Sequence, residues 1–482
     1  MRWGAMSTGT RQTQIPAAPV PPRTEGERKR KLAAVLAQRL EADIAAAGWR
    51  VGEVFASEEN LCSRYDVSRG ALREAIRLLE HRGVVRTRRS SPGGLVVQAP
   101  DAHPLARAMA VYLEFVGANV ADLLRARVLL EPAAARLASE RLTEDGINHL
   151  RASLRREQEA EGFDSTGHER LHIVLADHCG SAVLTLFVDV LVQLTINYAQ
   201  VPTLPIDRKL QDLKSESDHA HKAIVDAIVS GDHVLAQHRS VRHLRAVNAW
   251  LLSVQQRPID RGSSSPAPLP PTAKLAETVA HRLMTDIVTS GMQAGQIFGS
   301  ESELQARSGV SRAVFREAVR LLEHHHIARM RRGPYGGLVI TEPDPAASIE
   351  AAGTYLRYRG TSTDEVRQVR DILELGALAA VTERLHEPEM HERLEAAAEF
   401  CGGATADERA VIFARLADDP ILELFTHILL AAEGLDAVPV ADDRDGQDAH
   451  ASVLSALLNG DSALARHRLG RHLRRPPTVQ GV

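Results

Sequence analysis

The sequence predicts a mainly α-helical protein in which two winged helix-turn-helix domains are each followed by an antiparallel all-α bundle. Three observations lead to this prediction. The pattern S-R-x-x-x-R-E-A-[I/V]-R-L-L-E-H occurs at Ser68–His81 and again at Ser311–His324, an offset of 243 residues. Two short β-like runs around a glycine-rich loop follow the first pattern. Long stretches of helical periodicity come next. A repeat of this length indicates an internal duplication.

The composition limits the class of protein. Apolar residues make up 44% and aromatic residues only 4%, which favours helices over strands. The net charge is −4, so any nucleic-acid signal must be local. Cys62, Cys179 and Cys401 form no C-x-x-C pair, which favours a reducing cytoplasm. There is no signal-peptide pattern and no run of about 18 apolar residues, so we expect neither secretion nor a membrane span.

The chain divides into six predicted segments. Pro-rich and Ser-rich stretches mark a leader and a linker, and the periodic regions mark the domains. The segments are a leader at 1–26, a winged domain at 27–100, a helical domain at 104–256, a linker at 257–271, a second winged domain at 272–343, and a second helical domain at 346–475.

The first winged domain can be followed residue by residue. A helix begins at about Glu27, and Ser57 is placed to cap a short second helix. Ser68 caps a third helix that ends near His81. The runs Val84–Thr87 and Leu95–Gln98 alternate around a Ser-Ser-Pro-Gly-Gly loop, which predicts a hairpin. Three helices followed by a hairpin, within about 70 residues, are typical of a winged helix-turn-helix.

The region after the first hairpin contains helical periodicity and no strand signal. It therefore predicts an all-α bundle. The expected helices are 105–116, 119–140, 143–161, 165–179, 181–200, 209–230 and 232–254.

The repeated stretch is basic in an otherwise acidic chain. Residues 64–89 contain eight arginines and three acidic residues, and residues 307–332 contain seven and two, so each stretch carries +5. The third helix of each copy has an inward apolar stripe, formed by Leu72, Ile76 and Leu79 and by Phe315, Val319 and Leu322. A separate stripe is formed by Arg69, Arg73 and Arg77 and by Arg312, Arg316 and Arg320. An apolar seam beside an arginine ridge is what a helix in the DNA major groove needs.

These residues resemble the winged helix-turn-helix of GntR-family transcriptional regulators. The match covers Ala56-Ser57-Glu58, Val67–Glu80 and the glycine-rich wing, and it recurs in the second copy. The resemblance implies a partner, double-stranded operator DNA, and no enzymatic activity. The residues expected at the interface are Ser68, Arg69, Gly70, Ala71, Arg73, Arg77, Gly93 and Gly94, and Ser311, Arg312, Ala313, Arg316, Arg320, Gly336 and Gly337. One position departs from the family pattern, because the usual Arg is replaced by Glu59 and by Ser302.

The first helical region resembles the FCD ligand-binding domain of FadR-like members. The resemblance implies a small-molecule effector, such as an organic acid, and a divalent metal, Zn²⁺ or Ni²⁺. The metal ligands that it implies are His168, His172, His221 and His243, with His168 where the family usually has Asp. Arg127, in the R-x-x-x-E pattern that Glu131 completes, would meet a carboxylate ligand.

The second helical region keeps part of this set. Arg370, Glu374, His450 and His472 have counterparts in the first, but Ala406 and Ala410 stand opposite His168 and His172. We therefore expect a degenerate bundle without a metal, retained for packing or dimer-like contact. The two winged domains could act as an intramolecular pseudo-dimer, or two chains could form a homodimer with four winged domains.

Two alternatives belong to other classes. His168–His172 also matches H-E-x-x-H, the motif of zinc peptidases, in which two His bind zinc and Glu is the general base. That motif needs a third ligand and a substrate-binding strand, and no strand is expected nearby. The other alternative is a ligand-binding or scaffold protein that does not bind DNA. The arginine ridge argues against it, and an absence of salt-dependent DNA binding would favour it.

Overall fold

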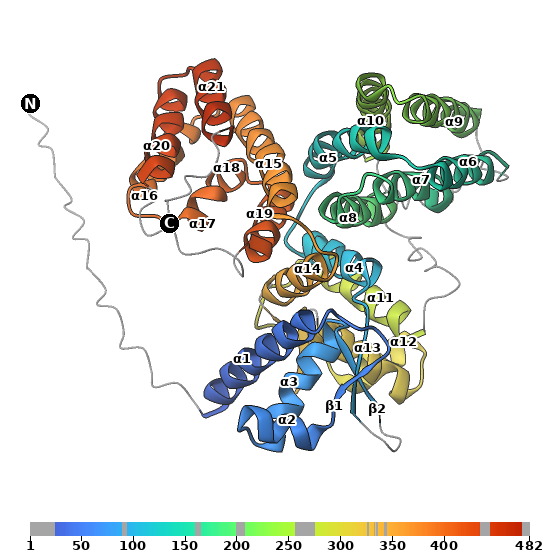
Figure 1. The fold of residues 1–482 in the computed structure, drawn as a ribbon, viewed down its shortest axis with the longest axis vertical. Coiled ribbons are helices and arrows are strands. Elements are labelled where there is room, and N and C mark those ends of the chain that lie inside the picture. The colour runs from blue at the N-terminus through green and yellow to red at the C-terminus, as the bar shows by residue number, and fades with distance from the viewer. Residues whose placement is uncertain are drawn as a thin grey trace, which may run out of the picture. The chain divides into compact units, whose positions relative to one another are not determined.

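The computed structural model describes residues 25–88, 94–159, 165–198, 208–255, 275–324, 327–331, 333, 336–341, 345–433 and 444–474. The chain forms two compact units, Met1–Pro100 and Asp101–Val482. Figure 1 shows the helices and strands of both units. In the described residues, none of the helices has the length and apolar character that crossing a membrane requires.

The first unit is a winged helix-turn-helix. Its sheet is antiparallel, with the strand order β1-β3-β2. The elements are α1 (Glu25–Ala46), β1 (Val54–Ala56), α2 (Glu58–Tyr65), α3 (Arg69–His81), β2 (Val85–Arg88) and β3 (Gly94–Val97). The hairpin of β2 and β3 lies within one residue of its predicted position. The sequence did not predict β1, which has three residues and pairs with a strand about 40 positions later.

The helix caps explain where α2 and α3 begin. The Ser57 hydroxyl accepts a hydrogen bond from the Asn60 backbone N–H at 3.2 Å, and the Ser68 hydroxyl accepts one from Ala71 at 3.3 Å. These bonds satisfy backbone donors that the first turn of a helix leaves free. The apolar stripe of α3 is buried as predicted, which fixes the opposite face toward solvent.

The second winged domain repeats this architecture within the second unit. Its strand order is β4-β6-β5. The elements are α11 (Leu275–Ser290), β4 (Ile297–Gly299), α12 (Glu301–Ser308), α13 (Arg312–His324), β5 (Ala328–Arg331) and β6 (Gly337–Ile340). A Cβ on Gly94 or Gly337 would lie 2.8 or 2.5 Å from a carbonyl oxygen of the neighbouring strand. Glycine at these positions therefore allows the strands to approach.

The first bundle is entirely helical in its described residues, and its helices follow the predicted ones within three residues at each end. They are α4 (Ala102–Phe115), α5 (Val120–Arg141), α6 (Glu144–Glu159), α7 (Ser165–Asp177), α8 (Ala182–Tyr198), α9 (Arg208–Val229) and α10 (His233–Gln255). Helix α8 is buried along most of its described length, as expected of a central bundle helix.

The second bundle has the same helix order with one change. In place of α7 it has two short helices, α17 and α18. Its elements are α14 (Ala346–Tyr358), α15 (Thr363–Glu383), α16 (Met390–Cys401), α17 (Ala406–Ala410), α18 (Ile412–Leu416), α19 (Pro420–Glu433), α20 (Arg444–Leu458) and α21 (Ser462–Leu473).

The two bundles share one hydrophobic core. At its centre the rings of Phe187 and Phe425 stack at 3.9 Å between centroids and 4° between planes. Both side chains are fully buried. The two residues are equivalent in the duplication, because each is the sixth residue of its helix and ends the sequence L-x-L-F. A residue that meets its own counterpart is the signature of a twofold interface.

The polar contacts at this seam are also reciprocal. Ser181 and Asp419 cap α8 and α19, and each also contacts a residue near the start of the long helix in the other bundle. Ser181 Oγ donates to Glu365 Oε1 at 2.7 Å. Asp419 accepts from Arg125 Nη1 at 2.6 Å, and Arg125 also contacts Asp122, the counterpart of Glu365. The bundles are thus related as the two subunits of a symmetric dimer would be.

Candidate functional site

The predicted recognition helices, α3 and α13, expose their arginines. Arg73 and Arg77 keep 63% and 71% of their side-chain area in solvent. The three arginines of α13 are similarly exposed. Because the apolar stripe of each helix is buried in its own winged domain, the arginine ridge is the face left for a partner.

Carboxylates at the start of the preceding helix orient this ridge. Arg73 Nε lies 3.4 Å from Glu58, the first residue of α2. In the second domain Glu301 accepts from the Nε atoms of both Arg312 and Arg316, at 3.2 and 3.0 Å. These hydrogen bonds from Arg316 and Arg312 lower the pKa of Glu301. Exposed pairs of this kind contribute little stability, so DNA phosphates can replace the carboxylate.

The remaining predicted DNA contacts fall into three groups. Ser68 and Ser311 precede the two recognition helices. Gly70 and Ala313 are exposed on the first turn, and Ala71 is half-buried. Gly94 and Gly337 are buried at the start of a strand, Gly336 is half-buried, and Gly93 lies outside the described residues. The close approach of the neighbouring strand already explains why Gly94 and Gly337 are glycines. A DNA contact by these two residues therefore stays a prediction.

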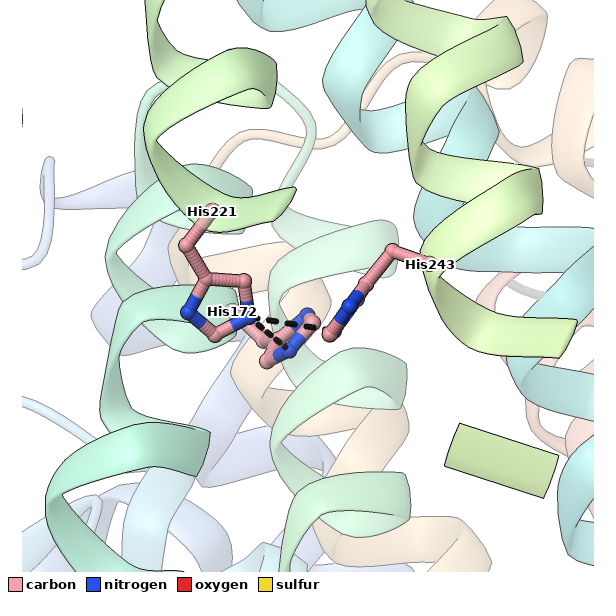
Figure 2. Close-up of side chains that lie close together, drawn as sticks. All are labelled: His172, His221 and His243. Atoms are coloured by element: carbon pink, nitrogen blue, oxygen red, sulfur yellow. Dashed lines mark hydrogen bonds between the residues drawn. The ribbon is translucent and has the colours of Figure 1, made fainter. Parts of the chain in front are cut away.

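Three of the four predicted metal ligands meet in the first bundle (Figure 2). His172 on α7, His221 on α9 and His243 on α10 are all buried. The Nε2 atom of His221 lies 3.2 Å from that of His172 and 3.0 Å from that of His243. One ligand atom from each residue lies within 4.8 Å of the others. The side chain of His168 is outside the described residues, so its predicted role stays a prediction.

Two buried carboxylates hold the outer nitrogens of this cluster. Glu131 Oε2 lies 2.6 Å from His172 Nδ1, and Glu157 Oε1 lies 2.7 Å from His221 Nδ1. When Nδ1 donates its proton to a carboxylate, the Nε2 lone pair points at the cluster centre. Two such lone pairs 3.2 Å apart repel each other, and a cation between them would remove this repulsion.

The spacing fits a metal ion. A Zn–N bond of about 2.1 Å places two nitrogen ligands of a tetrahedron about 3.4 Å apart. The observed 3.0 and 3.2 Å are close to this value. Three buried imidazoles, two of them oriented by carboxylates, form a suitable donor set for Zn²⁺ or Ni²⁺.

Arg127 contacts the cluster indirectly, through Glu131. Its side chain is fully buried, its Nε lies 2.5 Å from Glu131 Oε1, and its Nη1 donates to Thr195 Oγ1 at 2.8 Å. Burial raises the pKa of Glu131, but Arg127 and His172 more than offset it, and the pKa falls to about 2. Glu131 is therefore ionised and can hold the ring of His172. The predicted contact between Arg127 and a ligand carboxylate stays a prediction.

Glu157 was not among the predicted site residues. It lies on α6, 15 residues before His172, and no motif links it to the histidines. Only the packing of α6 against α9 places it beside His221. The sequence offered no signal by which it could have been found.

The second bundle has no comparable cluster among its described residues. The sequence placed Ala410 opposite His172, but the structure places Phe413 there. Phe413 lies five positions before the aspartate of an L-A-D sequence, Asp418, as His172 lies five positions before Asp177. Its ring stacks on His450, the counterpart of His221, with centroids 5.7 Å apart. An apolar ring therefore stands where the first bundle has the predicted ligand His172.

A separate hollow of about 440 Å³ lies at the seam between the bundles. Its charged lining is mainly acidic, with Asp122, Asp418, Asp419 and Glu423 against Arg415. Such walls repel an organic acid, so the hollow is a poor site for the predicted effector.

Fold and site together define a class: a DNA-binding protein with a ligand-binding helical bundle attached. The family described as "Bacterial regulatory proteins, gntR family" matches residues 32–93 and again 275–334, and the FCD domain family matches residues 122–246. These matches cover about half of the chain. The chain belongs to the GntR family of transcriptional regulators, with an FCD domain and a duplicated winged helix-turn-helix.

Curated relatives include both repressors and activators. The HTH-type transcriptional repressor NanR of Citrobacter rodentium is 29% identical over 248 residues, which is 47% of this chain and 88% of the relative. The Glc operon transcriptional activator of Escherichia coli K12 is 26% identical over 48% of this chain and 92% of its own length. Among solved structures, Streptococcus agalactiae GntR has a TM-score of 0.34 at 22% identity, covering 45% of this chain and 99% of that one.

Proposed function

We propose that both recognition helices bind operator DNA and that a metal-assembled effector site in the first bundle controls this binding. The observation that carries the proposal is the buried cluster of His172, His221 and His243 in a chain with two exposed arginine ridges. The protein would act in the cytoplasm, as a regulator rather than an enzyme.

The DNA-binding part is tested on the two ridges together. DNA fragments that bind the purified chain are first selected from genomic DNA. The double substitution Arg69→Ala/Arg312→Ala should weaken binding by about 1–3 kcal/mol for each arginine that reads a base. Arg466→Ala/Arg471→Ala removes two exposed arginines of α21 and is the matched control. Equal binding by both variants at several salt concentrations would refute the model.

The effector would bind at the metal. Three protein ligands leave at least one position of a tetrahedral ion open, and a carboxylate oxygen is a suitable fourth ligand. We therefore propose a small organic acid as effector, as the resemblance also implies. Arg127 would hold Glu131, and through it His172, in the geometry that the ion needs.

A matched pair of histidines tests the metal centre. His221→Ala removes the central ligand of the first cluster, and His450→Ala removes its counterpart in the second bundle. Metal content of the purified chain, measured by mass spectrometry, should be one ion per chain in wild type and His450→Ala. It should be near zero in His221→Ala. Equal metal content in both variants would contradict the proposed site.

The peptidase alternative is not favoured by these contacts. His172 is joined by His221 and His243 from two later helices, whereas the described residues around the cluster contain no strand for a peptide substrate. The relatives are transcription regulators. A peptidase assay with and without chelator should show no metal-dependent cleavage.

We also propose that a single chain is the functional unit. The reciprocal contacts of Phe187 with Phe425 and of Ser181 with Glu365 support this proposal, because they resemble the contacts between two subunits of a symmetric dimer. The seam is thus already filled within one chain. Light scattering of the purified protein should give the mass of one chain, 52.5 kDa. A stable mass of twice that value would favour the homodimer with four winged domains.

A further inference from the structure

The two DNA-reading domains of this chain are built alike but do not carry the same reading residues. Their strand order is the same and their recognition helices have the same length. Both bury an apolar stripe and expose three arginines at the same spacing. The two domains should therefore dock on DNA in the same way, so any difference in the exposed residues becomes a difference in the DNA they prefer.

The first difference lies on the outer face of the recognition helix. Its second residue is Gly70 in the first domain and Ala313 in the second, and both are exposed. Residues in the first turn of a recognition helix are those that reach base edges. The Ala313 methyl group can contact a thymine methyl, but the hydrogen of Gly70 cannot. A Cβ on Gly70 would meet nothing closer than 3.9 Å, so the fold does not require glycine there.

The second difference is one of charge. Early in the preceding helix, Glu59 of the first domain corresponds to Ser302 of the second, and both are exposed. A carboxylate at this position repels phosphate and can only accept hydrogen bonds, whereas a hydroxyl can donate to either phosphate or base. The first domain should thus bind DNA more weakly than the second. Glu59 should also form hydrogen bonds with fewer kinds of base than Ser302 does.

The third difference concerns the arginines themselves. Glu301 holds both Arg312 and Arg316 in the second domain. In the first domain, Glu58 holds Arg73 at 3.4 Å, and the described residues show no ion pair for Arg69. The leading arginine is therefore fixed in one domain and not in the other, which changes where its guanidinium group can reach.

From these differences we propose that the chain reads an asymmetric operator made of two unlike half-sites. Two identical subunits present identical recognition helices and therefore favour a palindrome. A chain that carries both helices is free of that constraint. The proposal rests on the proposed DNA binding and adds the kind of DNA that is bound: a strong half-site read by the second domain and a weaker, different half-site read by the first.

The experiment is selection of binding sequences from a random duplex library with the full-length chain. Two variants exchange the reading residues, Glu59→Ser/Gly70→Ala in the first domain and Ser302→Glu/Ala313→Gly in the second. Wild type should select two distinct half-sites. At the bases read by residues 59 and 70, the first variant should select the strong preference in both half-sites, and at those read by residues 302 and 313 the second variant should select the weak preference in both. On the wild-type operator the second variant, which brings a carboxylate to the strong half-site, should lose on the order of tenfold in affinity, the effect of about one mismatched base pair. The first variant, which removes a carboxylate, should not lose affinity.

The outcomes separate two kinds of failure. If wild type selects a palindrome and neither exchange alters the selected sequence, the asymmetric operator is refuted while DNA binding stands. If Arg69→Ala/Arg312→Ala binds the library as well as wild type does, the proposed DNA binding itself fails. As a further check, Arg312→Ala should erase sequence preference in the strong half-site only, and an absence of preference in both halves would also overturn the proposal.

Discussion

Replacing Phe187 with alanine should weaken the seam between the two bundles by about 3 kcal/mol. The ring is fully buried and stacks on Phe425 at 3.9 Å. Phe→Ala substitutions in cores cost about 3–5 kcal/mol, and part of this cost falls within the first bundle rather than at the seam. A weakening of the seam by about 3 kcal/mol corresponds to a roughly 150-fold weaker association, because about 1.4 kcal/mol is tenfold.

The association can be measured after cutting the chain between the halves. A specific protease site placed within residues 257–271 allows the purified chain to be cleaved, and analytical ultracentrifugation then gives the dissociation constant of the two pieces. Phe425→Ala should weaken the association to a similar extent as Phe187→Ala. The double substitution should cost less than the sum of the two, by about 1 kcal/mol, since the rings contact each other.

The control uses a phenylalanine from another core. Phe315 is equally buried, but it belongs to the core of the second winged domain. Any change that Phe315→Ala makes in the free energy of association should simply add to the change made by Phe187→Ala, because the two side chains lie in different cores. If Phe187→Ala changes the dissociation constant less than threefold, the stacked rings do not hold the bundles together and the reasoning from the seam fails.

Three further predictions follow from single residues. Gly94→Ala should destabilise the first winged domain by about 2 kcal/mol, because its Cβ would lie 2.8 Å from a carbonyl oxygen. Gly70→Ala, which meets no such contact, should leave the stability unchanged, and thermal melting compares the two variants. Burial raises the pKa of Asp371 to about 6, so its folded form keeps a proton that the unfolded chain, with a pKa near 3.9, has released. The free energy of unfolding should therefore decrease as the pH rises from about 4 to about 6. Asp371→Asn should remove this decrease and add on the order of 1 kcal/mol of stability at pH 7, after allowance for the partial exposure of the side chain. A pH profile of thermal melting that the substitution leaves unchanged would contradict this. Glu157→Gln should weaken metal binding about 10–100-fold by loosening His221, and isothermal titration with Zn²⁺ would show whether it does.

Local signals were enough to predict most of the fold from the sequence. The caps Ser57 and Ser68 and the apolar stripe of α3 lie where the residue pattern placed them. Strand β1 was missed because its three residues carry no alternation that a short window can detect. It forms only by pairing with β3, and Gly94 makes room for that pairing.

The candidate site was predicted in part. His172, His221 and His243 were found because the family resemblance supplied their spacing, and the structure brings them together. Glu157 carries no such signal, since its contact with His221 depends on the packing of two helices. Phe413 was overlooked for another reason. The two copies differ in length in this region, so the alignment of Ala410 with His172 was out of register. The shared L-A-D sequence and the ring contact with His450 correct it.

Phe413 has a consequence for how the regulator would respond to its effector. In a homodimer each subunit brings its own site, and coupling between two sites can make the response steeper than a simple binding curve. In the part of the chain that the structure describes, the second bundle has an aromatic ring where the first has the proposed ligand His172, so one chain would offer one proposed site for two DNA-reading domains. A single site gives a Hill coefficient of one. The response of transcription to effector concentration would therefore be graded, spread over about two decades of concentration, rather than a sharp switch.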